Sequence, residues 1–253
     1  MAIQLAKQGA ILVLASRNKE KLEEVALKCR ELGTKAIAIP TDVSIEGQCR
    51  HLLEKTLKEF GRIDTLINNA GFGIRGNFEE YKNLDLFRRL IDVNFYGPVY
   101  CTKYALPYLK QTKGRIVAIS SVLGKVTTPG NTAYCGSKHA MAGFFDSLRL
   151  ELRNSGVTIT MAYPGYVVTE FAERMINPDG TLQGTKGQKF YAPWMLTPQR
   201  CADVIIKAAA KRKRQVIMTP YGVVGAWLSV FAPSLLDYLS CLVSKFNKER
   251  VGK

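Results

Sequence analysis

Short apolar runs alternate along this chain with longer segments in which apolar residues recur every three or four positions. Residues 11–15 form an unbroken apolar run, which predicts a strand buried on both faces. The following segment repeats apolar residues on one helical face. Asn18 suits the capping position at its start, and Gly33 suits its end. The pattern therefore predicts a strand followed by an amphipathic helix.

The alternation continues through most of the chain. We expect strands at residues 36–39, 65–69, 115–120, 157–163 and 215–218, and helices at residues 1–9, 45–60, 84–110 and 132–154. Strands that alternate with helices imply crossover connections and an α/β fold with a doubly wound parallel sheet, of the Rossmann-like kind. The polar, glycine-rich residues 177–188 interrupt this order and predict a loop or lid.

The end of the chain has a different character, so we expect one α/β domain over residues 1–220 and an apolar tail over residues 221–253. Between residues 221 and 246 the only charged side chains are Asp237 and Lys245, and Pro233 would break a single long helix. Two interpretations stand side by side. The tail packs on the domain or on a second subunit, or it lies on a membrane surface.

The net charge of the chain limits the kinds of partner that we expect. The chain carries 36 Lys and Arg against 21 Asp and Glu, a formal charge of +15, which favours anionic partners. A phosphorylated cofactor and an acidic membrane surface both fit. Nucleic acid does not, because no recognition module or aromatic–basic interleaving is present. The dense run Lys211 to Arg214 is interpreted as a solvated helix end.

Cysteine and histidine usage excludes several site classes. The six cysteines are scattered without a C-x-x-C pair, which is typical of reduced thiols and predicts a cytoplasmic protein, with membrane association as the open addition. Only two histidines exist, His51 and His139, so a histidine triad or a multi-histidine metal site is not expected.

The candidate chemistry lies in one helix and the strand before it. Tyr134 and Lys138 are four residues apart, so on a helix they share a face. A nearby ammonium stabilises the tyrosinate and is expected to lower the Tyr134 pKa, which suits proton transfer at a carbonyl or alcohol. Ser121 ends the preceding strand, at the sheet edge where ligands bind in such folds.

With this Ser, Tyr and Lys spacing, the chain resembles the short-chain dehydrogenase/reductase family. The resemblance implies a catalytic set of Ser121, Tyr134, Lys138 and Asn94, with Ser121 and Tyr134 contacting the substrate. It also implies cofactor contacts from a further set: Ser16, Arg17, Asp42, Val43, Asn69, Ala70, Gly71, Asn94, Tyr134, Lys138, Pro164, Gly165, Val167 and Thr169. The matched segments include Asn-Asn-Ala-Gly at 68–71 and Pro-Gly at 164–165.

The cofactor preference rests on the end of the first strand. Family members that use NAD(H) usually have an acid there, whereas this chain has Arg17, whose guanidinium suits a 2′-phosphate. We therefore expect NADP(H) rather than NAD(H). Residues 71–76 also satisfy G-x-G-x-x-G, but no amphipathic helix follows, so we do not interpret them as a dinucleotide fingerprint.

One family segment is not matched. The family begins with a strand and a T-G-x-x-x-G-x-G turn before a helix that ends as residues 5–10 do here. The resemblance thus implies a fold truncated by its first strand and glycine-rich turn. We expect an unpaired edge on the strands at 11–15 and 65–69. If the chain starts at Met1, we expect weak NADPH binding and low stability. Three explanations of the unmatched first strand and turn remain open: a gene start set too late, a shortened isoform, or a boundary set by cloning.

The sequence supports two hypotheses of function. The first is an NADP(H)-dependent oxidoreductase that interconverts a carbonyl and an alcohol on a small molecule, with a steroid, retinoid or acyl compound suggested by the apolar tail and by residues 175–194. It is expected to be a homodimer and to need no metal. The alternative is an inactive or weakly active truncated relative that acts through dimerisation or membrane association.

Overall fold

The computed structural model describes residues 1–184 and 195–251. All paired strands in these residues are parallel, and they form two sheets. The first sheet has the order β1-β2 and the second has the order β3-β4-β5-β6. The strands are β1 (Leu12–Ser16), β2 (Ala36–Pro40), β3 (Thr65–Asn68), β4 (Arg115–Ile119), β5 (Thr158–Tyr163) and β6 (Gln215–Ile217).

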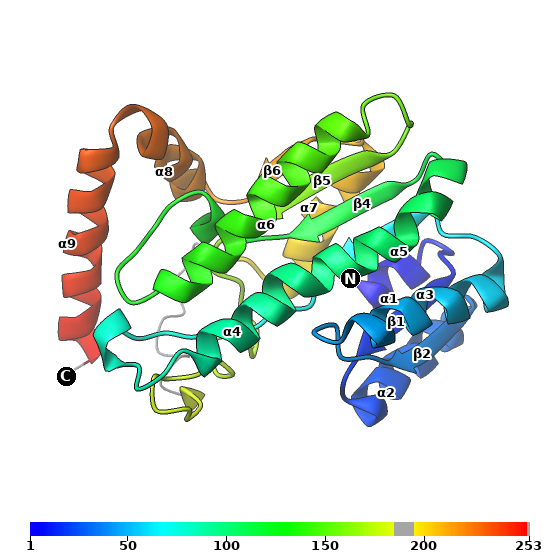
Figure 1. The fold of residues 1–253 in the computed structure, drawn as a ribbon, viewed down its shortest axis with the longest axis horizontal. Coiled ribbons are helices and arrows are strands. Elements are labelled where there is room, and N and C mark those ends of the chain that lie inside the picture. The colour runs from blue at the N-terminus through cyan, green and yellow to red at the C-terminus, as the bar shows by residue number, and fades with distance from the viewer. Residues whose placement is uncertain (185–194, 252–253) are drawn as a thin grey trace.

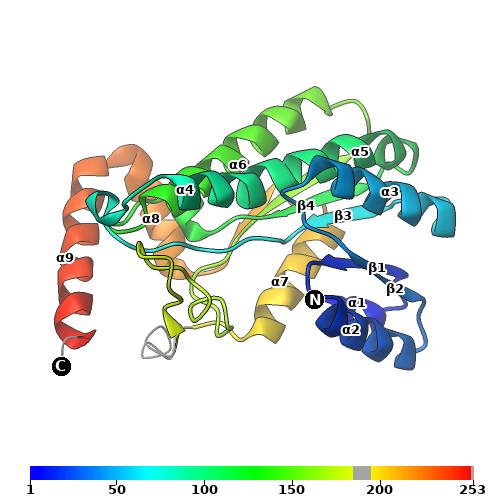
Figure 2. The same cartoon turned by 60° about the horizontal axis from the view of Figure 1, so that its bottom comes forward.

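Helices cover both faces of these strands (Figures 1 and 2). The helices before β4 are α1 (Ala2–Ala6), α2 (Lys19–Glu31), α3 (Glu46–Phe60), α4 (Asp85–Ile91) and α5 (Gly97–Gln111). Those after it are α6 (Thr132–Glu151), α7 (Pro198–Ala210), α8 (Pro220–Phe231) and α9 (Pro233–Val251). Helices α3, α5 and α6 share a core on one face, and α7 packs on the other. The predicted doubly wound α/β fold of the Rossmann-like kind is confirmed.

The alternation of side chains along β4 produces these two layers. Ile116 and Ala118 are fully buried in the core with α3, α5 and α6, whereas Val117 between them packs with α7. Successive residues of a strand point to opposite faces, so a strand covered by helices on both sides must be apolar at every position. The unbroken apolar sequence at residues 116–119 reflects that double coverage.

The strands β1 and β3 lie in different sheets and are not paired with each other in the described part of the chain. Each has a neighbour on one side only, as the sequence predicted for these two strands. The β1-β2 pair has its own small core, built mainly from Ala6, Leu12, Ala26, Cys29 and Ala36. The larger core lies over β3 to β5.

The long helix predicted at residues 84–110 is interrupted. One turn of π-helix, Asp92–Tyr96, separates α4 from α5. Such turns concentrate at functional sites because the extra residue re-aims the side chains within the turn. Here the re-aimed turn contains Asn94, which is fully buried.

The tail forms two helices, α8 and α9, which meet at Ala232 and Pro233 as the proline predicted. Both views show α9 standing beside α8 and away from the sheets (Figures 1 and 2). Among the described residues, no helix combines the length and apolarity that crossing a bilayer requires. The polar segment predicted at 177–188 forms turns and bridges up to residue 184, and its remainder, with residues 185–194, lies outside the described residues.

The basic run after α7 is exposed, as expected for a solvated helix end, but Arg212 also makes specific contacts with the body of the protein. The Arg212 guanidinium donates hydrogen bonds to the carbonyl oxygens of Lys113, Gly114 and Gly156 and to the Thr158 hydroxyl. Arg214 lies 3.6 Å from the Asp146 carboxylate. Arg212, which follows α7, therefore joins the end of that helix to the amino ends of β4 and β5.

Candidate active site

The four candidate catalytic residues come from three elements that meet at the carboxyl end of β4. Ser121 follows that strand and caps the short helix Val122–Gly124, its hydroxyl accepting the Leu123 amide at 3.2 Å. Tyr134 and Lys138 lie on the first turns of α6, and Asn94 lies in the π-helical turn. The predicted set is thus brought together in space.

Lys138 is buried, with 4% of its surface exposed. Its ammonium donates a hydrogen bond to the Ile119 carbonyl oxygen at 3.1 Å and lies 5.7 Å from the centre of the Tyr134 ring. Burial lowers the pKa of Lys138 to about 8, because the charged form loses hydration. This leaves a cation inside the site with hydrogen-bonding capacity for hydroxyl groups.

Tyr134 corrects one expectation. We predicted that Lys138 lowers its pKa, but burial raises the pKa of Tyr134 to about 12, and a hydrogen bond with the Ser121 side chain offsets only part of that rise. The ammonium lies 5.7 Å from the ring centre, and its charge is not among the causes that shift the pKa of Tyr134. In this arrangement Tyr134 is a protonated phenol at neutral pH.

Asn94 links the π-helical turn to two other segments of the site. Its side-chain oxygen accepts the Phe72 amide at 3.1 Å, and its amide group donates to the Phe72 carbonyl oxygen at 3.0 Å. The same group donates to the Ser137 hydroxyl at 3.1 Å. A Cβ at Gly71 would stand 3.0 Å from the Asn94 oxygen, so a larger residue there would require the hydrogen-bonded Asn94 side chain to shift. Residues 71–76 do not open a helix, which supports rejecting the fingerprint.

The expected adenosine contacts gather at the ends of β1 and β2. Arg17 follows β1, and its guanidinium lies 4.0 Å from the Asp42 carboxylate, with 62% of the Arg17 side chain exposed. Partial burial raises the pKa of Asp42, but hydrogen bonds from Ser44 and the charge of Arg17 outweigh it and hold that pKa below its usual value. Ser16 ends β1, and Val43 packs against Gly97 at the start of α5.

The remaining predicted cofactor residues lie after β3 and β5. Asn69, Ala70 and Gly71 follow β3, and Pro164, Gly165, Val167 and Thr169 follow β5. The Tyr221 hydroxyl accepts the Tyr166 amide at 3.0 Å, and a Cβ at Gly165 would stand 2.1 Å from the same oxygen. The loop after β5 is therefore held by the first turn of α8.

Three residues near the candidate site were missed from the sequence. Phe171 packs its ring 5.9 Å from the Tyr134 ring, and Arg89 lies over the Phe72 ring at 5.6 Å. The Ser137 hydroxyl joins Asn94 to the Tyr134 carbonyl oxygen. Of the three, only Ser137 could have been found from the sequence, because it lies between Tyr134 and Lys138 in the same helical turn. The other two reach the site through chain folding alone.

Comparisons with known proteins agree with this geometry. The family model described as short chain dehydrogenase matches residues 1–179. The chain belongs to the short-chain dehydrogenase family. It is 34% identical to 11-beta-hydroxysteroid dehydrogenase-like 4A of Arabidopsis thaliana over 237 residues, which are 93% of this chain and 77% of that protein. It is 33% identical to dehydrogenase/reductase SDR family member 7B of Bos taurus over 253 residues, covering 97% of this chain and 76% of that protein.

Solved structures of other short-chain dehydrogenases are also similar. A Caenorhabditis elegans family member of unknown function, solved with cofactor, has a TM-score of 0.75 and 28% identity over 85% of this chain and 86% of that one. An alcohol dehydrogenase of Thermococcus sibiricus, complexed with 5-hydroxy-NADP, has a TM-score of 0.72 over 86% of this chain and 90% of that one. At 24% identity this second likeness shows the fold alone.

Short-chain dehydrogenases use a nicotinamide dinucleotide, and the residues present fit one. Lys138 is a buried cation with no carboxylate in ion-pair contact among the described residues. Arg17 has an exposed guanidinium beside the end of β1. Gly71 lies beside the first of these cations, since a Cβ there would stand 3.6 Å from the Lys138 ammonium. The short-chain dehydrogenase therefore offers positive charge and hydrogen-bond donors along the sheet edge where the cofactor class binds.

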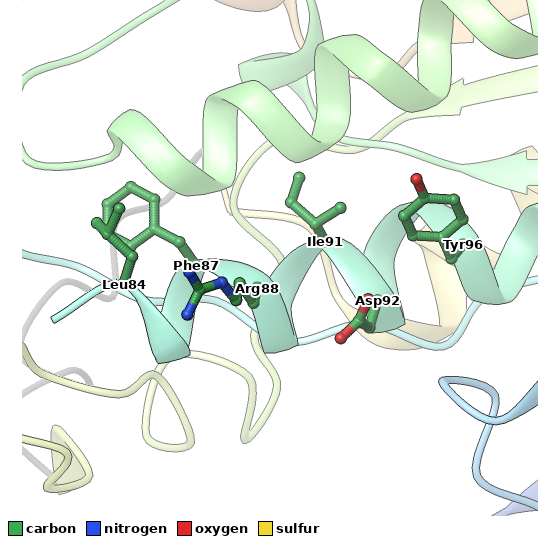
Figure 3. A pocket seen from close by; sticks show the side chains of 6 residues that line it. All are labelled: Leu84, Phe87, Arg88, Ile91, Asp92 and Tyr96. Atoms are coloured by element: carbon green, nitrogen blue, oxygen red, sulfur yellow. The ribbon is translucent and has the colours of Figure 1, made fainter.

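A separate groove of about 400 Å³ lies on the surface of α4 and the π-helical turn (Figure 3). Its lining residues are Leu84, Phe87, Arg88, Ile91, Asp92 and Tyr96. None of the candidate catalytic side chains lines it. The groove is thus a surface feature of the helical layer rather than part of the candidate active site.

Proposed function

We propose that this short-chain dehydrogenase is an NADP(H)-dependent oxidoreductase that interconverts a carbonyl and an alcohol on a lipophilic small molecule of the steroid class. The observation that carries the proposal is the meeting of Ser121, Tyr134 and the buried Lys138 at the carboxyl end of β4, with the Lys138 ammonium 5.7 Å from the centre of the Tyr134 ring. The proposed catalytic domain is residues 1–220, and residues 221–253 are proposed to make contacts outside it.

In the proposed reduction, Tyr134 donates its phenolic proton to the carbonyl oxygen while Ser121 donates a hydrogen bond to the same oxygen and fixes its position. The nicotinamide, when bound, supplies the hydride. Lys138 holds ribose hydroxyls, and Asn94 supports the proton path from Lys138. A phenol that is protonated at neutral pH suits the reducing direction.

The preference for NADP(H) rests on Arg17. Its guanidinium is largely exposed and stands beside a single carboxylate, that of Asp42, so a 2′-phosphate would meet an available cation. An acid that would bind the ribose 2′-hydroxyl of NAD is absent from residues 15–18. Titration of the purified protein with NADPH and NADH tests the preference, and equal affinities would contradict it.

The lipophilic substrate class is supported by the surroundings of Tyr134. Phe171, Phe72, Leu123 and Ile176 pack in or against the apolar cluster that contains the Tyr134 ring. Several relatives bear the name 11-beta-hydroxysteroid dehydrogenase. A planar, mostly apolar substrate fits such a lining because burial of its surface drives binding, while its one oxygen meets Ser121 and Tyr134.

We also infer a cytoplasmic homodimer that contacts membrane lipid. A second copy is proposed to cover the helical layer of α4, α5 and α6. Tyr96 and Tyr100 stack there with ring centres 5.8 Å apart, and Phe95 packs against Phe144. The groove in Figure 3 adds Leu84, Phe87 and Ile91 to this aromatic surface.

The decisive test removes one oxygen atom, that of the Tyr134 hydroxyl. Tyr134→Phe should lower the rate of NADPH-dependent reduction of an 11-oxo steroid at least a thousandfold, because the proton donor is lost. NADPH affinity should change by less than about threefold, since the ring remains. Reduction is measured by the loss of NADPH absorbance, and binding by fluorescence titration.

Tyr163→Phe is the matched control, because Tyr163 is buried in the main core, outside the candidate site. Retained turnover in Tyr134→Phe rules out the proposed role. Absence of turnover and of cofactor binding in the unmodified chain instead supports the alternative function, a weakly active or inactive relative that acts through dimerisation or membrane association.

A further inference from the structure

The helix α8 presents an unusual surface. It contains no charged side chain along its length from Pro220 to Phe231. Val224, Trp227, Val230 and Phe231 are 57%, 63%, 70% and 73% exposed. Their spacing of three and four residues places them on one side of the helix, and the Trp227 and Phe231 rings stack with centres 5.2 Å apart. This stripe is unpartnered in the described chain.

The helix α9 continues the apolar surface. Leu235, Tyr238, Leu239, Leu242 and Val243 are exposed and recur at helical spacing, whereas Asp237 and the serines lie on other sides of the helix. The helix packs chiefly on α8 and projects from the body of the molecule (Figures 1 and 2). Together α8 and α9 form a hairpin whose outer surface is apolar; we call it the tail hairpin.

The tail hairpin is fixed to the loops of the candidate active site. A Cβ at Gly222 would stand 2.7 Å from Val122, and one at Gly225 would stand 3.0 Å from Val126. Both valines lie in the segment that follows Ser121. The first turn of α8 also holds the loop after β5 through Tyr221. The apolar surface is therefore a rigid extension of the walls around Ser121 and Tyr134.

Charge indicates what covers this surface. The last nine residues of the chain, 245–253, contain four Lys or Arg and one Glu, and the whole chain carries +15. A helix pair with an apolar outer surface and a basic end complements an anionic lipid surface, where apolar side chains enter the headgroup region and basic ones meet phosphate. Trp and Tyr favour that interface because their rings are amphipathic. The aromatic surface proposed for a second copy lies elsewhere, on α4 to α6.

We propose that the tail hairpin docks on anionic lipid, with Trp227, Val230 and Phe231 entering the headgroup region, and so brings the loops after Ser121 and β5 close to that surface. Docking itself does not depend on catalysis. The consequence that a lipophilic substrate arrives directly from the lipid phase rests on the proposed function.

The experiment is flotation of the full chain with vesicles of phosphatidylcholine alone or mixed with phosphatidylserine. We expect the chain to float with the mixed vesicles and to be released as salt rises, because the basic segment contributes through screened charge. The double variant Trp227→Ser and Phe231→Ser should lower partitioning roughly tenfold or more, since two buried aromatic contacts are lost.

The matched control is Ile11→Ser with Leu150→Ser. These side chains are 57% and 75% exposed and lie outside the tail hairpin, so the control removes exposed apolar groups without touching the stripe. Circular dichroism and gel filtration verify that both variants stay folded. An equal loss in the control, or no flotation of the unmodified chain, overturns the proposal.

A third result also overturns it: vesicle binding is absent, and the tail variant alone becomes a smaller oligomer, which identifies a second copy as the occupant. Failure of the enzyme proposal is distinguishable, because flotation needs no turnover. In that case the unmodified chain and Tyr134→Phe would float equally while neither reduces a substrate.

Discussion

At the scale of single residues, burial gives Lys138 and Tyr134 opposite effects on stability as pH changes. The pKa of Lys138 falls from 10.5 to about 8 on folding, so between these values the unfolded chain binds more protons than the folded chain. The free energy of unfolding therefore rises with pH in that window. Tyr134, whose pKa rises from 10 to about 12, makes stability fall with pH between 10 and 12.

The variant Lys138→Met isolates the first effect. It removes the buried charge while keeping the apolar part of the side chain, so at pH 7 it should be more stable than the unmodified chain. The advantage should narrow by about 2 kcal/mol between pH 7 and pH 9.5, as Lys138 loses its proton in the unmodified chain. Urea unfolding at a series of pH values measures this difference. A pH-independent difference would show that Lys138 stays charged.

Phe171 and Arg89 mark the limit of prediction at this scale. The spacing of Tyr134 and Lys138 was visible in the sequence because both lie on one helix. The approach of Phe171 to Tyr134 depends on the path of the loop after β5, and that path depends on contacts with residues about a hundred positions away, such as the bridge between Ile74 and Ile176. No local pattern encodes such a distance.

At the scale of elements, the strands and helices follow the sequence closely, and the departures have local causes. The π-helical turn at Asp92–Tyr96 interrupts an apolar pattern that predicts one helix. Its extra residue turns Asn94 inward, where Phe72 and Ser137 satisfy its amide. The pattern of apolar residues carries no signal for a turn that is stabilised by hydrogen bonds to other segments.

The contacts of Arg212 between elements could not be predicted from the composition of the basic run. Arg212→Ala removes hydrogen bonds to three backbone carbonyls at the amino ends of β4 and β5, and should lower the free energy of unfolding by about 1–2 kcal/mol. Lys211→Ala, its neighbour in the same basic run, should change it by less than about 0.5 kcal/mol. Urea unfolding compares the two. Equal changes in the free energy of unfolding would indicate that the contacts of Arg212 contribute no more to stability than an ordinary solvated side chain.

At the scale of the whole molecule, the separation into two sheets divides the fold into parts of unequal stability. The β1-β2 sheet has two strands and a core of mostly small residues, whereas β4 and β5 are central strands over a core that contains Phe145, Met141 and Tyr163. Two-stranded sheets are marginal without extensive packing, so we expect the first sheet to open more readily.

Hydrogen exchange measured by mass spectrometry tests this expectation. Amides of Leu12–Ser16 should exchange at least about tenfold faster than those of Arg115–Ile119, because opening of the small sheet leaves the large core intact. Peptides from β5 serve as the internal reference for the large sheet. Equal protection of β1 and β4 would mean that both sheets unfold as one cooperative unit.

The sequence by itself determined the fold class, the order of the elements and the residues proposed for proton transfer, because each depends on short-range patterns: apolar periodicity, capping residues and the spacing of Ser121, Tyr134 and Lys138. The tertiary structure alone decided the ionisation of those residues, since burial depends on the whole core. It also decided which backbone carbonyls Arg212 binds and that the apolar side of the tail hairpin is exposed. Whether an apolar helix faces a core or solvent depends on which surfaces remain uncovered, and only the folded chain determines that.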